Sequence, residues 1–231
     1  MVYKRTLFNH SLFTHPCMLC QQESCRDVVC AQCRKLLPVV RHACRQCGLP
    51  LQDQYATVCG HCLQHPPYID HTISLFHYAT PMAEMICRLK FQQGLEYARG
   101  LGELMADRLK ELKPDVPQAL IPVPLHPKRM RNRGYNQALE MARPVSRQLQ
   151  IPIDTQLCFR SRYTHEQSQL SIKERKRNIR KAFSLYAKTK QYLHVAVIDD
   201  VVTTGHTVNE LARVLKQMGI QRVDVWTCCR A

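Results

Sequence analysis

The stretch Val195-Ala-Val-Ile-Asp-Asp-Val-Val-Thr-Thr-Gly-His-Thr207 decides the fold predicted for most of this chain. Its first four residues, together with His194, form an apolar run, as expected of a strand that is covered on both faces. A helical pattern follows over residues 207–218, and Gly219 stands where helices commonly end with a glycine. The stretch therefore predicts a strand, a loop and a helix, which together form one unit of an α/β sheet.

Further segments after residue 66 repeat this alternation of strand and helix. Predicted strands cover residues 72–78, 119–123, 157–161, 182–186, 194–198 and 222–229. Predicted helices cover residues 81–93, 95–112, 136–150, 171–180 and 207–218. Because strands that alternate with helices build βαβ units, we expect a doubly wound parallel sheet. Cys87, Cys158, Cys228 and Cys229 lie in these segments and are interpreted as small buried residues.

The loop after the strand at 194–198 carries groups that suit a ribose phosphate. Asp199 and Asp200 come at the carboxyl edge of the sheet, where open α/β folds bind ligands. Two adjacent carboxylates can accept hydrogen bonds from the 2′ and 3′ hydroxyls of a ribose. The residues that follow offer hydroxyls, a glycine and a helix N-terminus to a 5′-phosphate, and they are Thr203, Thr204, Gly205, His206 and Thr207. An ordinary turn with an aspartate cap is the alternative.

Four Cys-x-x-Cys pairs occupy the N-terminal part of the chain, namely Cys17/Cys20, Cys30/Cys33, Cys44/Cys47 and Cys59/Cys62. Each such turn can place two thiolates on one metal ion, so the pairs predict two structural Cys₄ zinc sites. Redox chemistry and plain burial are the alternatives. Sequential pairing, first with second and third with fourth, needs only short loops and is favoured over a cross-braced arrangement.

Several residues beside these pairs are interpreted as accessory. Cys25 falls outside the pattern, and His42 and His61 are superfluous once four thiolates are present. Gly48 and Gly60 follow or lie between ligands, where we expect tight turns with positive φ. Because so short a segment cannot bury a core without a staple, we expect a double zinc finger over residues 1–66 and an α/β domain over residues 67–231.

Composition restricts the location and the partners of the chain. No apolar run is long enough to span a bilayer, and residues 1–10 lack the apolar core of a signal peptide. We therefore expect a cytoplasmic protein, in which reduced thiols favour metal over disulfides. The formal net charge is +15, and residues 126–181 contain 14 Lys and Arg against 4 Asp and Glu. Such a surface attracts phosphorylated ligands, nucleic acid or anionic lipid, unless it is simply solvated.

The stretch from Val195 to Thr207 resembles the phosphoribosyl diphosphate (PRPP) signature of type I phosphoribosyltransferases. With the four Cys pairs, the whole chain is similar to the ComF/GntX-like family of competence proteins. The likeness is carried by Cys44-Arg-Gln-Cys-Gly-Leu-Pro50, Cys59-Gly-His-Cys-Leu-Gln64, Arg88-Leu-Lys-Phe91, Pro122-Val-Pro124, Arg133-Gly-Tyr-Asn-Gln137, Gln167-Ser-Gln-Leu-Ser171, Arg175 and Asn178. Each piece is short, but their order and combination are specific.

The resemblance implies a type I phosphoribosyltransferase-like sheet with Asp199 and Asp200 on the ribose diol and residues 203–207 around the 5′-phosphate of PRPP. It makes residues 122–134 a pyrophosphate loop, where Lys and Arg side chains suit phosphate recognition. The candidate donors are Lys128, Arg129 and Arg133, with Lys90 from the helix at 81–93. Magnesium would accompany PRPP. An exposed basic loop and a solvated helix lysine are the alternatives.

Residues 160–181 lie where type I phosphoribosyltransferases have a mobile hood loop that closes over the site. Gripping a nucleic-acid backbone is the other natural use of this basic segment, and such contacts depend strongly on salt. The candidate nucleic-acid contacts are Lys173, Arg175, Lys176, Arg177, Arg180 and Lys181.

Two functions from different classes follow. The resemblance implies a PRPP-binding, zinc-containing competence protein for DNA uptake in natural transformation, which handles incoming single-stranded DNA in the cytoplasm. Its expected partners are the competence ATPase or helicase and single-strand-binding factors, while the GntX likeness points to a gluconate-type role. The alternative is an active phosphoribosyltransferase that transfers ribose 5-phosphate from PRPP to an unknown acceptor.

Overall fold

The computed structural model describes residues 16–22, 27–91, 94–163, 181–186 and 190–231. The chain forms two compact units, Met1–Leu37 and Pro38–Ala231. The first unit contains the short helix α1 (Ala31–Lys35). The second contains the sheet together with helix α2 (Gly60–Gln64) of the second cysteine segment. The domain boundary predicted after residue 66 stays a prediction.

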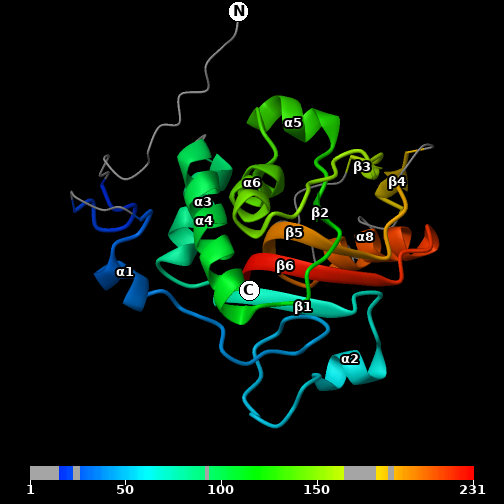
Figure 1. Ribbon diagram of the computed structural model, residues 1–231, viewed down its shortest axis with the longest axis horizontal. Helices are drawn as coiled ribbons and strands as arrows, with labels where there is room; N and C mark the ends of the chain where they lie inside the picture. Colours follow the sequence, from blue (N-terminus) through cyan, green and yellow to red (C-terminus); the bar gives the residue numbers. More distant parts are fainter. Residues whose placement is uncertain (1–15, 23–26, 92–93, 164–180, 187–189) are drawn as a thin grey trace, which may run out of the picture. The chain divides into compact units, whose positions relative to one another are not determined.

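A four-stranded parallel sheet forms the centre of the second unit (Figure 1). Its strands are β1 (His71–His77), β6 (Arg222–Arg230), β5 (His194–Val202) and β2 (Ala119–Pro122), in that spatial order. The parallel sheet predicted from the sequence is therefore confirmed. Strand β5 continues past the predicted end at residue 198 and pairs Asp199 with Thr227 and Val201 with Cys229 on β6. The two aspartates are thus held by the sheet itself.

Helices cover both faces of this sheet. They are α3 (Met82–Phe91), α4 (Leu95–Leu112), α6 (Gln137–Leu149) and α8 (His206–Gln217), close to the predicted ranges. On one face Val195 and Val197 of β5 pack with Leu211 and Leu215 of α8. Side chains alternate along a strand, so Ala196 and the other alternate residues of the strands point to the opposite face. Helices α4 and α6 pack together on that face. The sheet is buried on both sides, which explains the apolar run in β5.

Helices α4 and α6 cross closely at Gly102. A Cβ atom at this position would lie 2.4 Å from the carbonyl oxygen of Met141 on α6. We expect Gly102→Ala to force the helices apart and to lower the free energy of unfolding by about 2 kcal/mol, as overpacked cores do. Urea denaturation measures this change, with Gly60→Ala, which has open space around it, as the control. Equal stability of the two variants would contradict the prediction.

Two segments differ from the sequence prediction. Helix α5 (Pro127–Arg133) stands where a loop was expected. Pro127 occupies the first turn, the His126 ring accepts a hydrogen bond from the Lys128 backbone N–H, and Gly134 ends the helix at φ 82°. Secondly, β3 (Cys158–Arg160) and β4 (Phe183–Leu185) form a separate antiparallel pair. The helix predicted at 171–180 lies outside the described residues.

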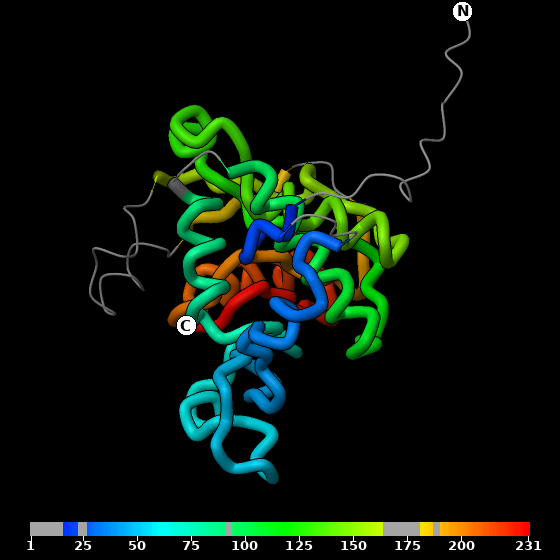
Figure 2. Tube along the Cα trace, turned by 90° about the vertical axis from the view of Figure 1, so that its left-hand side faces the viewer, coloured from blue at the N-terminus to red at the C-terminus, as the bar shows by residue number. Residues whose placement is uncertain are grey.

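The free edge of β1 is covered by the chain that leads into the second cysteine segment. Val40 donates its backbone N–H to Leu75 over 3.0 Å, and Thr72 donates to the carbonyl oxygen of Arg45 over 2.7 Å. Residues 38–46 run along this edge, and the blue-to-cyan trace that follows projects away from the sheet as a lobe (Figure 2). Because an uncovered edge strand exposes unpaired backbone groups, this segment protects the sheet.

The isolated cysteines follow their helix and strand faces. Cys158, Cys228 and Cys229 are buried, as predicted, but Cys87 is exposed. The prediction for Cys87 was wrong because this residue lies on the outer face of α3. Among the described helices, none combines the length and the apolar character needed to cross a bilayer.

Candidate PRPP pocket and zinc centres

A cavity of about 350 Å³ opens at the carboxyl end of the sheet. This volume is within the range of small-molecule sites. Its polar wall contains Tyr78, Lys90, Arg129, Arg133, Asn136, Gln137, Arg160, Asp199, Asp200, Thr203 and Thr207. Parallel sheets bind ligands at this edge, so the position agrees with the site expected from the sequence.

Asp199 and Asp200 lie next to each other at the end of β5. The backbone N–H of Asp200 donates to Asp199 Oδ1 over 3.0 Å, and that of Val201 donates to Asp200 Oδ1 over 2.9 Å. Burial raises the pKa of Asp199 well above its usual range, the neighbouring Asp200 raises it further, and Lys90 opposes both effects. A cation or a diol that binds here therefore relieves repulsion between two carboxylates.

Lys90 reaches the acidic pair from α3. Its ammonium nitrogen lies 3.0 Å from Asp200 Oδ2. Burial lowers the pKa of Lys90, but Asp200 and Asp199 raise it by more, so the net shift is upward. The side chain stays charged inside the cavity and can contact a ligand that lies against the aspartates.

The predicted phosphate loop begins at the cavity wall. Thr203 and Thr207 line the cavity, whereas Thr204, Gly205 and His206 belong to the same loop without lining it. Gly205 has φ 75° and precedes the first turn of α8, so its lack of a side chain permits this conformation. Within the described residues, the buried Thr204 Oγ1 has no hydrogen-bond partner. The Thr204 hydroxyl therefore lacks an acceptor within the protein, and the oxygen of a bound phosphate would be a suitable one.

Helix α5 carries three of the four cations predicted for the pyrophosphate, and two of these three lie at the cavity. Arg129 and Arg133 line the cavity. Lys128 does not, because its ammonium nitrogen lies 4.9 Å from the centre of the Tyr163 ring. Neighbouring residues on one helix point in different directions, so a run of cations in the sequence cannot specify which of them face a ligand.

Arg160, at the end of β3, is a site residue that the sequence reasoning did not assign. It is 6% exposed and lines the cavity. Burial and nearby Arg129 lower its pKa to about 10, while Asp199 opposes this shift. No local signal singles it out, because β3 pairs with β4 outside the parallel sheet. Tyr78, Asn136 and Gln137 also line the cavity without having been assigned.

The predicted nucleic-acid contacts are mostly outside the described residues. This holds for Lys173, Arg175, Lys176, Arg177 and Arg180. Lys181 is described, is exposed, and donates its backbone N–H to Glu210 Oε1 over 2.7 Å. The backbone N–H of Lys181 is thus used within the protein, and its ammonium group is the part that would bind an anionic partner.

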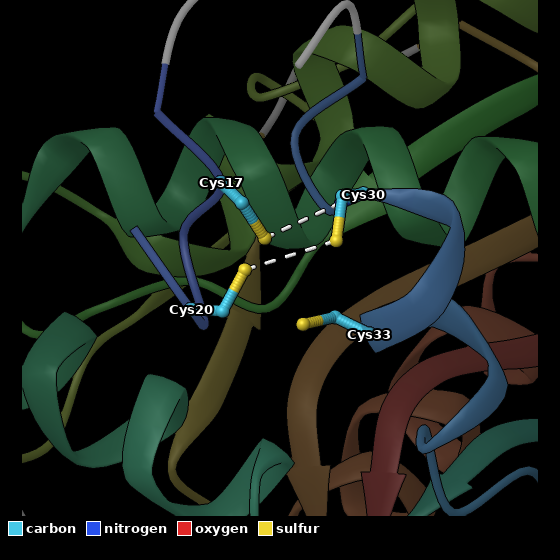
Figure 3. A group of neighbouring side chains, drawn as sticks. All are labelled: Cys17, Cys20, Cys30 and Cys33. Atoms are coloured by element: carbon cyan, nitrogen blue, oxygen red, sulfur yellow. Dashed lines mark hydrogen bonds between the residues drawn. The ribbon is translucent and has the colours of Figure 1, made fainter. Parts of the chain in front are cut away.

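The first two Cys pairs converge on one centre, formed by Cys17, Cys20, Cys30 and Cys33 (Figure 3). All four sulfur atoms lie within 4.8 Å of one another, and those of Cys20 and Cys30 are 3.8 Å apart. A tetrahedral zinc ion with Zn–S bonds of about 2.3 Å requires sulfur separations of about 3.8 Å. The side chains therefore fit zinc, and the sequential pairing is confirmed.

The second centre repeats this design with Cys44, Cys47, Cys59 and Cys62. The backbone N–H of Cys59 donates to Cys44 Sγ over 3.2 Å, as that of Cys30 does to Cys17 Sγ over 3.3 Å. Burial raises the pKa of Cys44, but backbone N–H donors from Cys59 and Cys47 lower it by more, to about 7. Such donors stabilise the thiolate form that binds metal.

The two glycines beside the second centre behave differently. Gly48 has φ 68°, as predicted, and a Cβ there would meet Ser74 Oγ at 2.2 Å. The prediction for Gly60 was wrong, because this residue begins α2 and is not among the residues with positive φ. Gly60 is helical and does not form the left-handed turn that was expected there.

Comparisons with known proteins agree with this two-part organisation. Residues 8–63 match the family model of the double zinc ribbon domain. Competence protein F of Haemophilus influenzae is 36% identical over an alignment of 231 residues, and the match covers 96% of this chain and 99% of that protein. DNA utilization protein YhgH of Escherichia coli K12 is 36% identical over 208 residues, covering 87% and 90%. Competence protein ComFC of Bacillus subtilis is 26% identical over 223 residues, covering 88% and 89%.

A solved structure is also similar to part of this chain. A purine phosphoribosyltransferase from Pyrococcus horikoshii is 13% identical with a TM-score of 0.33, and the match covers 69% of this chain and 86% of that one. The fold assignment rests on the sheet described above. The fold and the site define a double zinc ribbon protein with a parallel α/β sheet and a charged cavity at its carboxyl edge. Its similarity to competence protein F over nearly the whole length shows that the chain belongs to the ComF family.

Proposed function

We propose that the protein binds PRPP in the cavity and works in DNA uptake, where it handles single-stranded DNA in the cytoplasm. The observation that carries the PRPP assignment is that an acidic pair and several cations line one cavity. In this proposal Asp199 and Asp200 bind the diol, while Lys90, Arg129 and Arg133, which line the same cavity, bind the diphosphate. A ligand with both a vicinal diol and phosphates matches this distribution of charge better than either group alone.

The remaining polar groups fit the other parts of the same ligand. Thr203, Thr207 and the N-terminal turn of α8 suit the 5′-phosphate, since a helix N-terminus carries partial positive charge. Mg²⁺ bound with PRPP would be held at Asp199 and Asp200 and would offset the charge of the diphosphate. Arg160 adds a further guanidinium to the lining of the cavity.

Calorimetry of PRPP with Mg²⁺ on the full zinc-loaded chain tests this assignment. We expect Arg133→Met to weaken PRPP binding about tenfold, which is the effect of losing one charge-assisted hydrogen bond. Lys128→Met removes the same charge from the same helix but outside the cavity, so we expect less than about a twofold change. Equal losses in both variants, or no measurable binding of PRPP to the unmodified protein, would contradict the assignment.

The DNA-handling part of the proposal is supported by the names of the relatives and by the high positive charge of the chain. Competence proteins and a DNA utilization protein align with almost the entire chain. Binding through phosphate contacts depends steeply on salt. We expect affinity for a single-stranded oligonucleotide to fall at least about tenfold between about 50 and about 200 mM salt. Binding that does not change with salt would contradict this mode.

Phosphoribosyl transfer remains the alternative activity of the same cavity. It would release pyrophosphate when PRPP and an acceptor are both present. A panel of acceptors with a pyrophosphate readout separates the two functions. PRPP binding with no turnover across the panel favours a binding role, whereas turnover with one acceptor identifies an enzyme.

A further inference from the structure

Arg230 connects the second zinc centre with the strand that carries the acidic pair. It is the last residue of β6, and only 9% of it is exposed. Its Nε donates to the carbonyl oxygen of Cys47 over 3.2 Å, and its Nη1 donates to the carbonyl oxygen of Val202 over 3.1 Å. Nη1 also contacts the Ala231 oxygen. The Arg230 guanidinium thus donates hydrogen bonds both to the backbone of a zinc-ligand turn and to the backbone at the end of β5.

The contact with Cys47 is electrostatically favourable when the centre holds zinc. Four thiolates around one Zn²⁺ carry two negative charges in excess. Cys47 is one of these ligands, and Arg230 lies against its carbonyl group. No Asp or Glu side chain within the described residues forms an ion pair with Arg230. A buried guanidinium needs compensation, and the metal centre provides it.

The contact with Val202 reaches the proposed PRPP pocket. Val202 ends β5, two residues after Asp200, and Thr203 on the cavity wall follows it directly. Its carbonyl oxygen also accepts the backbone N–H of Ala231 over 3.1 Å, and Ala231 lines the same cavity. Movement of Arg230 would therefore displace the point where strand β5 turns into the phosphate loop.

The second ribbon, residues 44–62 around the second zinc centre, has another contact with the sheet that does not reach β5 or the phosphate loop. Thr72 Oγ1 on β1 donates to the carbonyl oxygen of Gln46 over 2.7 Å. It attaches the turn just before Cys47 to the sheet, but to an edge strand that does not pair with β5. Thr72 therefore provides a matched control, because it anchors the same ribbon without touching the phosphate loop.

We propose that Arg230 is a positioning residue that couples zinc in the second centre to the conformation of residues 200–207, which are the end of β5 and the phosphate loop. The consequence for PRPP rests on the proposed function, whereas the coupling between zinc and loop does not. Coupling of this kind is reciprocal, so a ligand in the pocket affects the metal centre as much as the metal affects the pocket.

Hydrogen exchange measures the coupling without a ligand. In the full zinc-loaded chain, we expect Arg230→Lys to speed amide exchange at residues 200–207 about tenfold, because it loses one of the two charge-assisted contacts, and Arg230→Met to speed it by at least as much, because it loses both. Lysine keeps the charge but cannot hold both carbonyl groups. Thr72→Val should speed exchange in residues 44–62 and leave residues 200–207 unchanged. Unchanged exchange at residues 200–207 in both Arg230 variants would overturn the proposal.

Cadmium-113 resonance gives a spectroscopic readout at the metal. A chain loaded with ¹¹³Cd should give one signal for each of the two centres. We expect PRPP with Mg²⁺ to shift one of these signals in the unmodified chain and in Thr72→Val, but not in Arg230→Lys. If calorimetry detects PRPP binding and neither signal moves, the coupling is refuted. If PRPP does not bind, the exchange experiment still decides the coupling, and only the proposed function fails.

Discussion

Asp199→Asn combined with Asp200→Asn should weaken PRPP binding by at least about 100-fold, because each carboxylate contributes charge-assisted hydrogen bonds to the diol or its Mg²⁺. The two side chains line the same cavity as the cations. Calorimetry on the double variant measures the loss. Asp115→Asn removes a carboxylate from an exposed position outside the cavity and serves as the control. Retained affinity in the double variant would show that the cavity binds phosphate without reading the ribose.

The same carboxylates predict a pH dependence of binding. Burial and Asp200 raise the pKa of Asp199, so the proton competes with a cation or diol that prefers the carboxylate. PRPP affinity should therefore rise as the pH increases through the raised pKa of Asp199, and this slope should disappear in the double variant. Affinity that falls with increasing pH would contradict the assigned role, once the ionisation of PRPP itself has been subtracted.

Asp199→Asn alone should stabilise the protein in the absence of ligand. A carboxyl group whose pKa is raised by folding makes the folded state less stable at any pH above its unfolded pKa. Asparagine removes this cost, and we expect an increase in Tm of about 2–4 °C, the shift that about 1 kcal/mol produces in a domain of this size. Scanning calorimetry checks it. A lower Tm would mean that Asp199 stabilises the fold through Lys90.

The sequence predicted the parts of the site that follow from local patterns. The apolar run before Asp199 fixed a buried strand, so the acidic pair had to emerge at the carboxyl edge of the sheet. The spacing of the Cys pairs likewise predicted both metal centres and their pairing. These features depend on residues that lie close together in the chain, where geometry is set by a turn or a strand.

Features that depend on distant segments were less predictable. Arg160 enters the cavity because β3 pairs with β4, and no local pattern distinguishes it from other basic residues nearby. Lys128 does not line the cavity, because its segment forms helix α5 in place of the expected loop and its side chain lies against Tyr163. Arg230 contacts Cys47, which lies far away in the sequence, only after the sheet has formed. Tertiary packing decides these orientations.

Loss of a ligand in the second zinc centre should unfold the ribbon while leaving most of the sheet intact. Cys44→Ser removes one of four thiolates, and structural zinc contributes about 10–16 kcal/mol to the folding of small zinc-finger peptides. This exceeds the stability that so short a segment can supply without metal. We expect bound zinc to fall from two ions to one for each chain, with fast amide exchange over residues 44–62.

The consequence for the sheet distinguishes a docked ribbon from an independent one. Thr72 donates its backbone N–H to Arg45, so unfolding of the ribbon should also speed exchange at the start of β1. The exposed edge should then promote association between chains, which light scattering detects. Cys87→Ser, an exposed cysteine outside both centres, should change neither zinc content nor exchange. If Cys44→Ser retains slow exchange at Thr72, the edge of the sheet is stable without its zinc ribbon.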